Sequence, residues 1–183
     1  MKILDATCGF KGIWFQKNHP FVTFMDKRNG KYYFITPSGK KKCTKVNPDI
    51  VSEWKDAPFP DNYFDMVIFD PPHIIRGEKT TGKLILDYGK LNCKTWEQEL
   101  KVGIKKLFKI LKPEGTFILK WNECNKPINK IIKLFPYQPL FGTRTGLNNK
   151  NIWLVFLKYD VNDKLDNWEI ERNRKQELFT GGY

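Results

Sequence analysis

Short apolar runs separated by turn residues recur along the chain, and they predict strands. The run Met66–Phe69 lies between Asp65 and the sequence Asp70-Pro71-Pro72. An uninterrupted run of this kind is typical of a strand buried on both faces of a parallel sheet. We expect strands at Ile3–Ala6, Phe21–Met25, Lys31–Ile35, Lys42–Val46, Met66–Phe69, Thr116–Leu119, Pro139–Arg144 and Asn151–Lys158, and a strand or turn at Asp49–Trp54.

The apolar spacing changes to three or four residues between Thr95 and Leu111, which predicts a helix that ends before Pro113-Glu114-Gly115. We expect short helices at Ile13–Phe15 and Asn129–Leu134, a charged helix at Asp166–Leu178, and a polar loop at Arg76–Asn92. Alternation of strands and helices predicts an α/β protein with a Rossmann-like, doubly wound, mostly parallel sheet. The last two strands are expected to form a C-terminal antiparallel hairpin.

Composition supports a folded domain with a basic surface. The 183 residues include 32 Lys and Arg against 20 Asp and Glu, a net charge of +12, and 15% are aromatic. This aromatic content excludes a disordered basic tail. No apolar run approaches the roughly 20 residues that span a bilayer. No signal peptide opens the chain. We therefore expect a cytoplasmic or intracellular protein without membrane contact. The charge favours a polyanionic partner, and solubility alone is the alternative explanation.

Cysteines and histidines do not form a metal-binding pattern. Cys8, Cys43, Cys93 and Cys124 are scattered, and His19 and His73 are the two histidines. Zinc sites need closely spaced pairs of such ligands. We therefore expect no metal and four free thiols.

Acidic residues follow four of the predicted strands, at Asp5, Asp26, Glu53 and Asp70. Ligands of open α/β sheets bind at the carboxyl ends of the strands. Each residue alone could be a turn former, but four at one edge favour a site. The turn that begins at Asp5 contains Gly9, which allows a ligand to approach the backbone, and Asp26 can accept hydrogen bonds from a ribose diol. The dinucleotide fingerprint G-x-G-x-x-G is absent, which disfavours NAD.

The sequence Asp70-Pro71-Pro72-His73 indicates a site for an amino group. Prolines stiffen the backbone and leave carbonyls without competing N–H groups. An aspartate before them can accept a hydrogen bond from an exocyclic amine, a proline carbonyl can accept the second one, and His73 can stack on a base. The alternative is an ordinary strand terminator.

These motifs together resemble the class I S-adenosylmethionine-dependent methyltransferases. Leu4–Gly9 is similar to their first motif, and Asp26 and Glu53 stand where the family has its ribose-binding and adenine-contacting acids. Asp70–His73 resembles the Asp/Asn/Ser-Pro-Pro-aromatic motif of amino-methyltransferases that act on nucleic acid. The whole stretch is also similar to small phage- and prophage-type methyltransferases that carry Asp-Pro-Pro-His. The resemblance covers residues 3–158. Two positions depart from the usual glycine, at Thr7 and Lys11, and His73 replaces the usual larger aromatic residue.

The resemblance implies S-adenosylmethionine as cofactor and methylation of an exocyclic amine, with adenine N6 in DNA or RNA as the first candidate. Residues 1–160 would form the catalytic domain and residues 161–183 a charged helix or tail. The implied catalytic residues are Asp70, Pro71, Pro72 and His73. The implied cofactor-binding residues are Asp5, Ala6, Thr7, Cys8, Gly9, Asp26, Glu53 and Trp54.

Basic residues are predicted to contact the nucleic acid. Arg76, Lys79 and Lys83 would flank an entering base, and Lys120 follows a predicted strand. Cations interleaved with aromatic residues at Lys27–Phe34 are typical of nucleic-acid binding, although a solvated hairpin has the same pattern. The alternative functions are methylation of a small molecule or a protein amide, and a non-catalytic nucleic-acid-binding subunit of a methyltransferase complex. A protein partner or a homo-oligomer is also compatible with the sequence.

Overall fold

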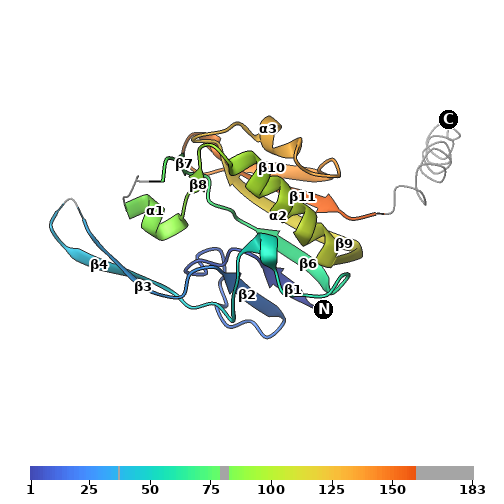
Figure 1. The fold of residues 1–183 in the computed structure, drawn as a ribbon, viewed down its shortest axis with the longest axis horizontal. Helices are drawn as coiled ribbons and strands as arrows, with labels where there is room; N and C mark the ends of the chain where they lie inside the picture. Colours follow the sequence, from blue (N-terminus) through green and yellow to red (C-terminus); the bar gives the residue numbers. More distant parts are fainter. Residues whose placement is uncertain (37, 79–82, 160–183) are drawn as a thin grey trace, which may run out of the picture.

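The computed structural model describes residues 1–36, 38–78 and 83–159, without the side chains of residues 83 and 84 (Figure 1). The charged helix predicted at Asp166–Leu178 and the predicted substrate residue Lys79 lie outside the described residues. No helix among the described residues is long and apolar enough to cross a membrane.

A seven-stranded sheet forms the centre of the molecule, in the order β10-β11-β9-β6-β1-β2-β5. Strands β9, β6, β1, β2 and β5 run parallel, and β11 is antiparallel to both β9 and β10. This arrangement confirms the mostly parallel sheet and the C-terminal antiparallel hairpin. The strands are β1 (Ile3–Asp5), β2 (Val22–Asp26), β5 (Ile50–Val51), β6 (Phe64–Phe69), β9 (Leu111–Asn122), β10 (Phe141–Thr145) and β11 (Asn151–Leu157).

A two-stranded hairpin, β3 (Gly30–Ile35) and β4 (Lys41–Val46), connects β2 to β5 and projects away from the main sheet (Figure 1). The strands predicted at Lys31–Ile35 and Lys42–Val46 are confirmed, and they pair as a hairpin. The prediction of a loop at Arg76–Asn92 is wrong, because the described part of this segment forms α1 (Lys83–Tyr88) and contributes to the short parallel pair β7 (Ile75–Arg76) and β8 (Leu91–Asn92). Ile75 and Leu91 of this pair are buried, and strands of two residues each are too short to give an alternating sequence pattern.

The helix predicted from the spacing near Thr95 is α2 (Trp96–Ile110), and the second one is α3 (Ile128–Ile132). Two 3-10 turns, η1 (Trp54–Asp56) and η2 (Leu147–Asn149), complete the described elements. The helix predicted at Ile13–Phe15 is wrong, because the segment between β1 and β2 consists of turns. Gly9 and Lys11 there have φ of +50° and +57°, outside the right-handed helical region, so the chain turns where a helix would have to begin.

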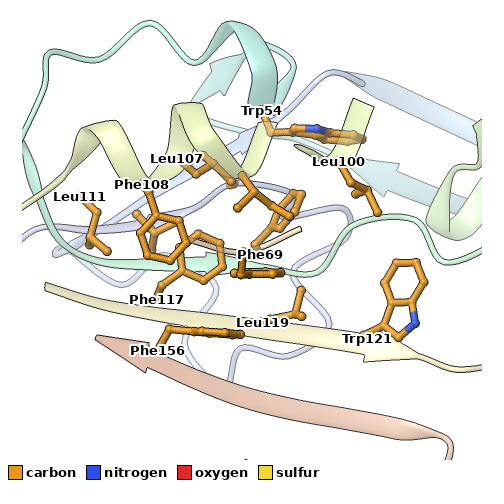
Figure 2. Close-up of a cluster of buried hydrophobic side chains, with 14 of the residues drawn as sticks. Trp54, Phe69, Leu100, Leu107, Phe108, Leu111, Phe117, Leu119, Trp121 and Phe156 are labelled. Carbon is orange, nitrogen blue, oxygen red and sulfur yellow. The ribbon is translucent and has the colours of Figure 1, made fainter. Parts of the chain in front are cut away.

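The larger part of the core lies between the sheet and α2 (Figure 2). Phe108 of α2 stacks on Phe117 of β9, with ring centroids 4.7 Å apart, and Phe135 stacks on Phe156 at 4.3 Å. A smaller cluster on the opposite face contains Ile3, Val22, Phe24 and Ile68, and the turn residues Ile13 and Trp14 pack against it. The two faces of the sheet are therefore covered unequally, by a helix on one side and by a turn-rich segment on the other.

Gly103 allows Trp54 to pack directly against α2. A Cβ atom at Gly103 would lie 2.0 Å from Cδ1 of Trp54 and 2.4 Å from its Nε1. Trp54 is 6% exposed and makes an edge contact with Phe69 at 5.6 Å between ring centroids. The packing of Trp54 against Gly103 joins the segment after β5 to α2, and its contact with Phe69 joins the same segment to the sheet.

We predict that Gly103→Ala destabilises the protein, although alanine favours a helix by up to about 1 kcal/mol. The added methyl group would overpack the contact with Trp54, at a cost of about 1–3 kcal/mol. The free energy of unfolding, measured by urea denaturation, should therefore fall. Val102→Ala on the exposed side of α2 is the control and should change it by less than about 0.5 kcal/mol. A rise in stability of Gly103→Ala would contradict the packing described here.

Candidate active site

Three of the predicted strand-end acids lie at one edge of the sheet. Asp5 ends β1, Asp26 ends β2 and Asp70 follows β6, and β1 pairs in parallel with both of the other strands. They line two cavities that share Thr7, Arg28, Asp70 and Tyr88 and therefore adjoin.

The larger cavity, about 280 Å³, brings together predicted cofactor, catalytic and substrate residues from distant parts of the chain. These are Asp5, Thr7, Cys8, Gly9, Asp70, Pro71, His73 and Lys120, with Phe10, Gly12, Ile13, Arg28, Asp87 and Tyr88 completing the lining. The smaller cavity, about 30 Å³, is lined by Ala6, Thr7, Asp26, Trp54, Asp70 and Pro72, with Lys27, Arg28, Tyr88 and Gly89.

Asp5 is a buried carboxyl group at the floor of the larger cavity. The indole Nε1 of Trp14 donates to its Oδ2 at 2.6 Å, and the backbone N–H of Thr7 donates to its Oδ1 at 3.2 Å. Burial raises the pKa of Asp5 to about 7, the charges of Asp70 and Asp26 act in the same direction, and the two hydrogen bonds oppose the shift. A group with such a pKa changes charge near neutral pH.

The turn after β1 is fixed to the neighbouring strands by its own polar groups. The hydroxyl of Thr7 accepts a hydrogen bond of 2.9 Å from the backbone N–H of Asp70, and the N–H of Gly9 donates to Oδ2 of Asp26 at 2.9 Å. Burial raises the pKa of the Cys8 thiol, which therefore stays protonated. Thr7 thus has a structural role at a position where the resembling family usually has glycine.

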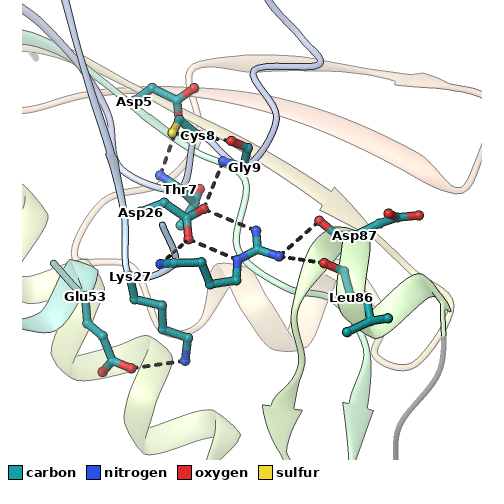
Figure 3. Close-up of polar contacts among 10 residues, drawn as sticks. Asp5, Thr7, Cys8, Gly9, Asp26, Lys27, Glu53, Leu86 and Asp87 are labelled. Atoms are coloured by element: carbon teal, nitrogen blue, oxygen red, sulfur yellow. Dashed lines mark hydrogen bonds and ion pairs between the residues drawn. The ribbon is translucent and has the colours of Figure 1, made fainter. Parts of the chain in front are cut away.

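Asp26 is bound on both carboxylate oxygens by Arg28 (Figure 3). The guanidinium Nε lies 3.0 Å from Oδ1 and Nη2 lies 3.2 Å from Oδ2. Nη1 donates to the carbonyls of Leu86 and Asp87 in α1, at 3.0 and 3.2 Å. Arg28 therefore joins the end of β2 to α1.

Sequence reasoning assigned Arg28 only to the basic hairpin and missed this role. The spacing of Asp26 and Arg28, two residues apart after a strand, was the available signal. The carbonyl partners in α1 lie nearly sixty residues further along the chain, so no local pattern identifies them.

Asp70 forms an ion pair with Lys120 of β9. Burial raises the pKa of Asp70, and the charge and hydrogen bond of Lys120 oppose that shift. Burial and the Lys120 charge lower the pKa of His73, so its imidazole is neutral at pH 7. The His73 ring lies 5.8 Å from the ring of Tyr88. The site thus brings the Asp70 carboxyl group, the Lys120 amino group and a neutral imidazole together in one cavity.

Glu53 and Arg76 are not among the described residues that line these cavities. Glu53 pairs with Lys27 at 3.0 Å and Lys55 at 2.8 Å, contacts that lower its pKa (Figure 3 shows the Lys27 pair). Arg76 is exposed on β7, and its Nη1 donates to the carbonyl of Ile75. Lys83 begins α1, and its side chain lies outside the described part of the chain. The binding roles of these residues stay predictions.

No family model matches the sequence, and no curated protein matches it. Among solved structures, the PH0226 protein of Pyrococcus horikoshii is similar with a TM-score of 0.55 and 16% identity, over 87% of this chain and 82% of that one.

Two further solved structures are described as methyltransferases. A SAM-dependent methyltransferase of Methanosarcina mazei has a TM-score of 0.51 and 11% identity, over 86% of this chain and 92% of that one. The 1,6-didemethyltoxoflavin-N1-methyltransferase of Burkholderia thailandensis, with bound S-adenosylhomocysteine, has a TM-score of 0.50 and 12% identity, over 86% and 71%. Together with the strand order, these similarities show that the chain has the Rossmann-like α/β fold of the class I S-adenosylmethionine-dependent methyltransferases.

Proposed function

We propose that the protein is a methyltransferase that uses S-adenosylmethionine to methylate an exocyclic amino group of a nucleic-acid base, with adenine N6 as the first candidate. The observation that carries the proposal is that Asp70, Pro71 and His73 line the same cavity as the glycine-containing turn after β1. A cofactor held by that turn and an amine held by Asp70 would therefore meet. Residues 1–160 would carry the reaction.

The residues of the two cavities suit the cofactor in charge and polarity. Asp5 is a carboxyl group suited to the ammonium of the amino-acid end, and Asp26 is suited to the ribose diol. Ala6, Trp54 and Pro72 offer apolar surface for the purine, and the smaller cavity of about 30 Å³ would have to widen to admit it. Arg28 occupies both oxygens of Asp26, so it would have to share or release that carboxylate. The cofactor would supply a methyl group bound to a positively charged sulfur.

The catalytic contribution of the chain would be positioning and electrostatics. Asp70 would accept one hydrogen bond from the amine, and a proline carbonyl would accept the other. This role requires the carboxylate form, because a protonated carboxyl group donates through its own O–H. Lys120 favours that form by opposing the effect of burial on the pKa of Asp70. His73, neutral at pH 7, would stack on the base.

Nucleic acid is the proposed substrate because of the charge of the chain and its distribution. The net charge is +12, and residues 27–46 next to the site contain seven basic residues and no acidic one. Methylation of a small molecule is the alternative. It is supported by the structural similarity to the 1,6-didemethyltoxoflavin-N1-methyltransferase. A base within a duplex would have to be flipped out of the stack to enter the cavity.

Methyl transfer from labelled cofactor to total DNA, total RNA and a low-molecular-weight extract separates these functions. Label in N6-methyladenine after nucleoside analysis is the expected result. Label only in the small-molecule fraction would support the alternative instead. Absence of cofactor binding in isothermal titration would indicate a non-catalytic subunit.

We predict that Asp70→Ala retains cofactor binding and loses methyl transfer by at least ~10²-fold, as for removal of a group that positions charge in a transition state. Single-turnover transfer measures the rate, and isothermal titration measures cofactor affinity. Asp65→Ala is the matched control, because Asp65 makes a surface ion pair with Lys112 away from both cavities. Undiminished transfer in Asp70→Ala would contradict the assignment.

We predict that Asp5→Asn weakens cofactor binding and that its stability relative to the wild type rises with pH. The folded pKa of Asp5, about 7, lies above its ordinary value of 3.8. The stability of the wild type is therefore lost as pH rises between these two values, because the unfolded state ionises first. The variant lacks this titration, so the thermal midpoint of the variant minus that of the wild type should be higher at pH 8 than at pH 5. A difference between the two midpoints that does not depend on pH would contradict the raised pKa of Asp5.

A further inference from the structure

The hairpin β3–β4 has two different faces. Its antiparallel register pairs Lys31 with Lys45, Tyr33 with Cys43 and Ile35 with Lys41. Side chains alternate between faces along a strand, so these six residues share one face, which we call the outer face. All six are exposed, Tyr33 at 53% and Ile35 at 73%.

The opposite face of the hairpin is joined to the candidate active site. The hydroxyl of Thr44 donates to Oδ1 of Asp87 in α1 at 2.7 Å. Arg28 joins the same helix to Asp26, and Tyr88 at its end lies beside His73. The hairpin therefore has a defined place next to the cavity, and its outer face points away from α1.

The charges and apolar side chains of the outer face indicate the kind of molecule that this face could bind. Lys31, Lys41 and Lys45 bring three positive charges, and the Lys41 ammonium lies 4.6 Å from the centre of the Tyr33 ring. No acidic residue occurs between residues 27 and 46 to neutralise them. Exposed Tyr33 and Ile35 add apolar surface between the lysines. A surface of this kind fits a polyanion that also presents apolar groups, such as the methyl groups of thymine.

The dimensions of the hairpin favour one form of nucleic acid. Each strand has six residues, which corresponds to a length of about 20 Å. A two-stranded ribbon fits the major groove of B-form DNA, which is about 12 Å wide, whereas the major groove of A-form RNA is too narrow and deep for side chains to read. We infer that the outer face of the β3–β4 hairpin binds duplex DNA in its major groove and holds it next to the cavity. This inference rests on the proposed function for the identity of the reaction, but not for the binding itself.

The test is equilibrium binding of the full chain, without cofactor, to a labelled 20-base-pair DNA duplex, followed by fluorescence anisotropy. An RNA duplex and a single DNA strand of the same sequence are compared with it. The variant K31Q/K41Q/K45Q removes the three charges of the outer face. The control K101Q/K105Q/K130Q removes three exposed lysines from α2 and α3.

The wild type should bind the DNA duplex more tightly than the RNA duplex or the single strand. The outer-face variant should bind the DNA duplex at least ~10-fold more weakly, with a slope of log K against log salt reduced by about 0.9 for each phosphate that the variant no longer neutralises. The control should change affinity by less than about threefold. Equal reductions of affinity in both variants, or equal binding to the RNA duplex or the single strand, would overturn the inference.

Methyl transfer by the same proteins separates this inference from the proposed function. Transfer to nucleic acid that is unchanged in the outer-face variant would overturn the role of the hairpin and leave the function intact. Binding of DNA through the outer face without transfer to any nucleic acid would support the binding surface and contradict the function.

Discussion

Three carboxyl groups gather at one edge of the sheet, and the surrounding structure depends on how their charge is balanced. The parallel pairing of β1 with β2 and β6 places Asp5, Asp26 and Asp70 close enough for the charges of the other two to raise the pKa of Asp5. Each group has a different partner: an indole N–H for Asp5, Arg28 for Asp26 and Lys120 for Asp70. These donors come from three separate segments, so the acids organise the loops around them.

The sequence predicted the sheet and its acidic edge because both follow from local patterns. Apolar runs such as Met66–Phe69 mark buried strands, and an acid directly after such a run lies at the sheet edge. The donors could not be predicted in the same way. Trp14 was expected in a helix, but its indole reaches back to Asp5, and Arg28 reaches α1, in a segment that was expected to be a loop. The conformation of these segments depends on contacts between residues far apart in the sequence, and such contacts leave no periodic pattern in the sequence.

The two connections that follow β1 and β2 contain no helix within the described residues. Their residues contribute more to the candidate site than to the hydrophobic core. A turn-rich segment replaces a helix after β1, and Trp14 both packs on Phe24 and binds Asp5. The β3–β4 hairpin follows β2, and it contributes Val46 to the buried residues while its outer face stays in solvent. Residues that add so little buried apolar surface contribute little to stability. The proposed nucleic-acid contact would use the exposed residues of the outer face, while Tyr32 and Phe34 are partly buried.

Lys120 connects the electrostatics of the catalytic motif to its proposed chemistry. A carboxyl group in a low-dielectric cavity tends to become neutral, which would remove the acceptor that an amine needs. The Lys120 charge opposes this tendency at Asp70 and also lowers the pKa of His73. A single cation thus favours an ionised acceptor and a neutral ring in the same cavity. It also occupies Asp70, so an entering amine has to compete with Lys120 for that carboxylate. In the proposed reaction, a base whose other contacts hold it in the cavity would compete better than a free amine, so selection of the substrate would depend on the whole base.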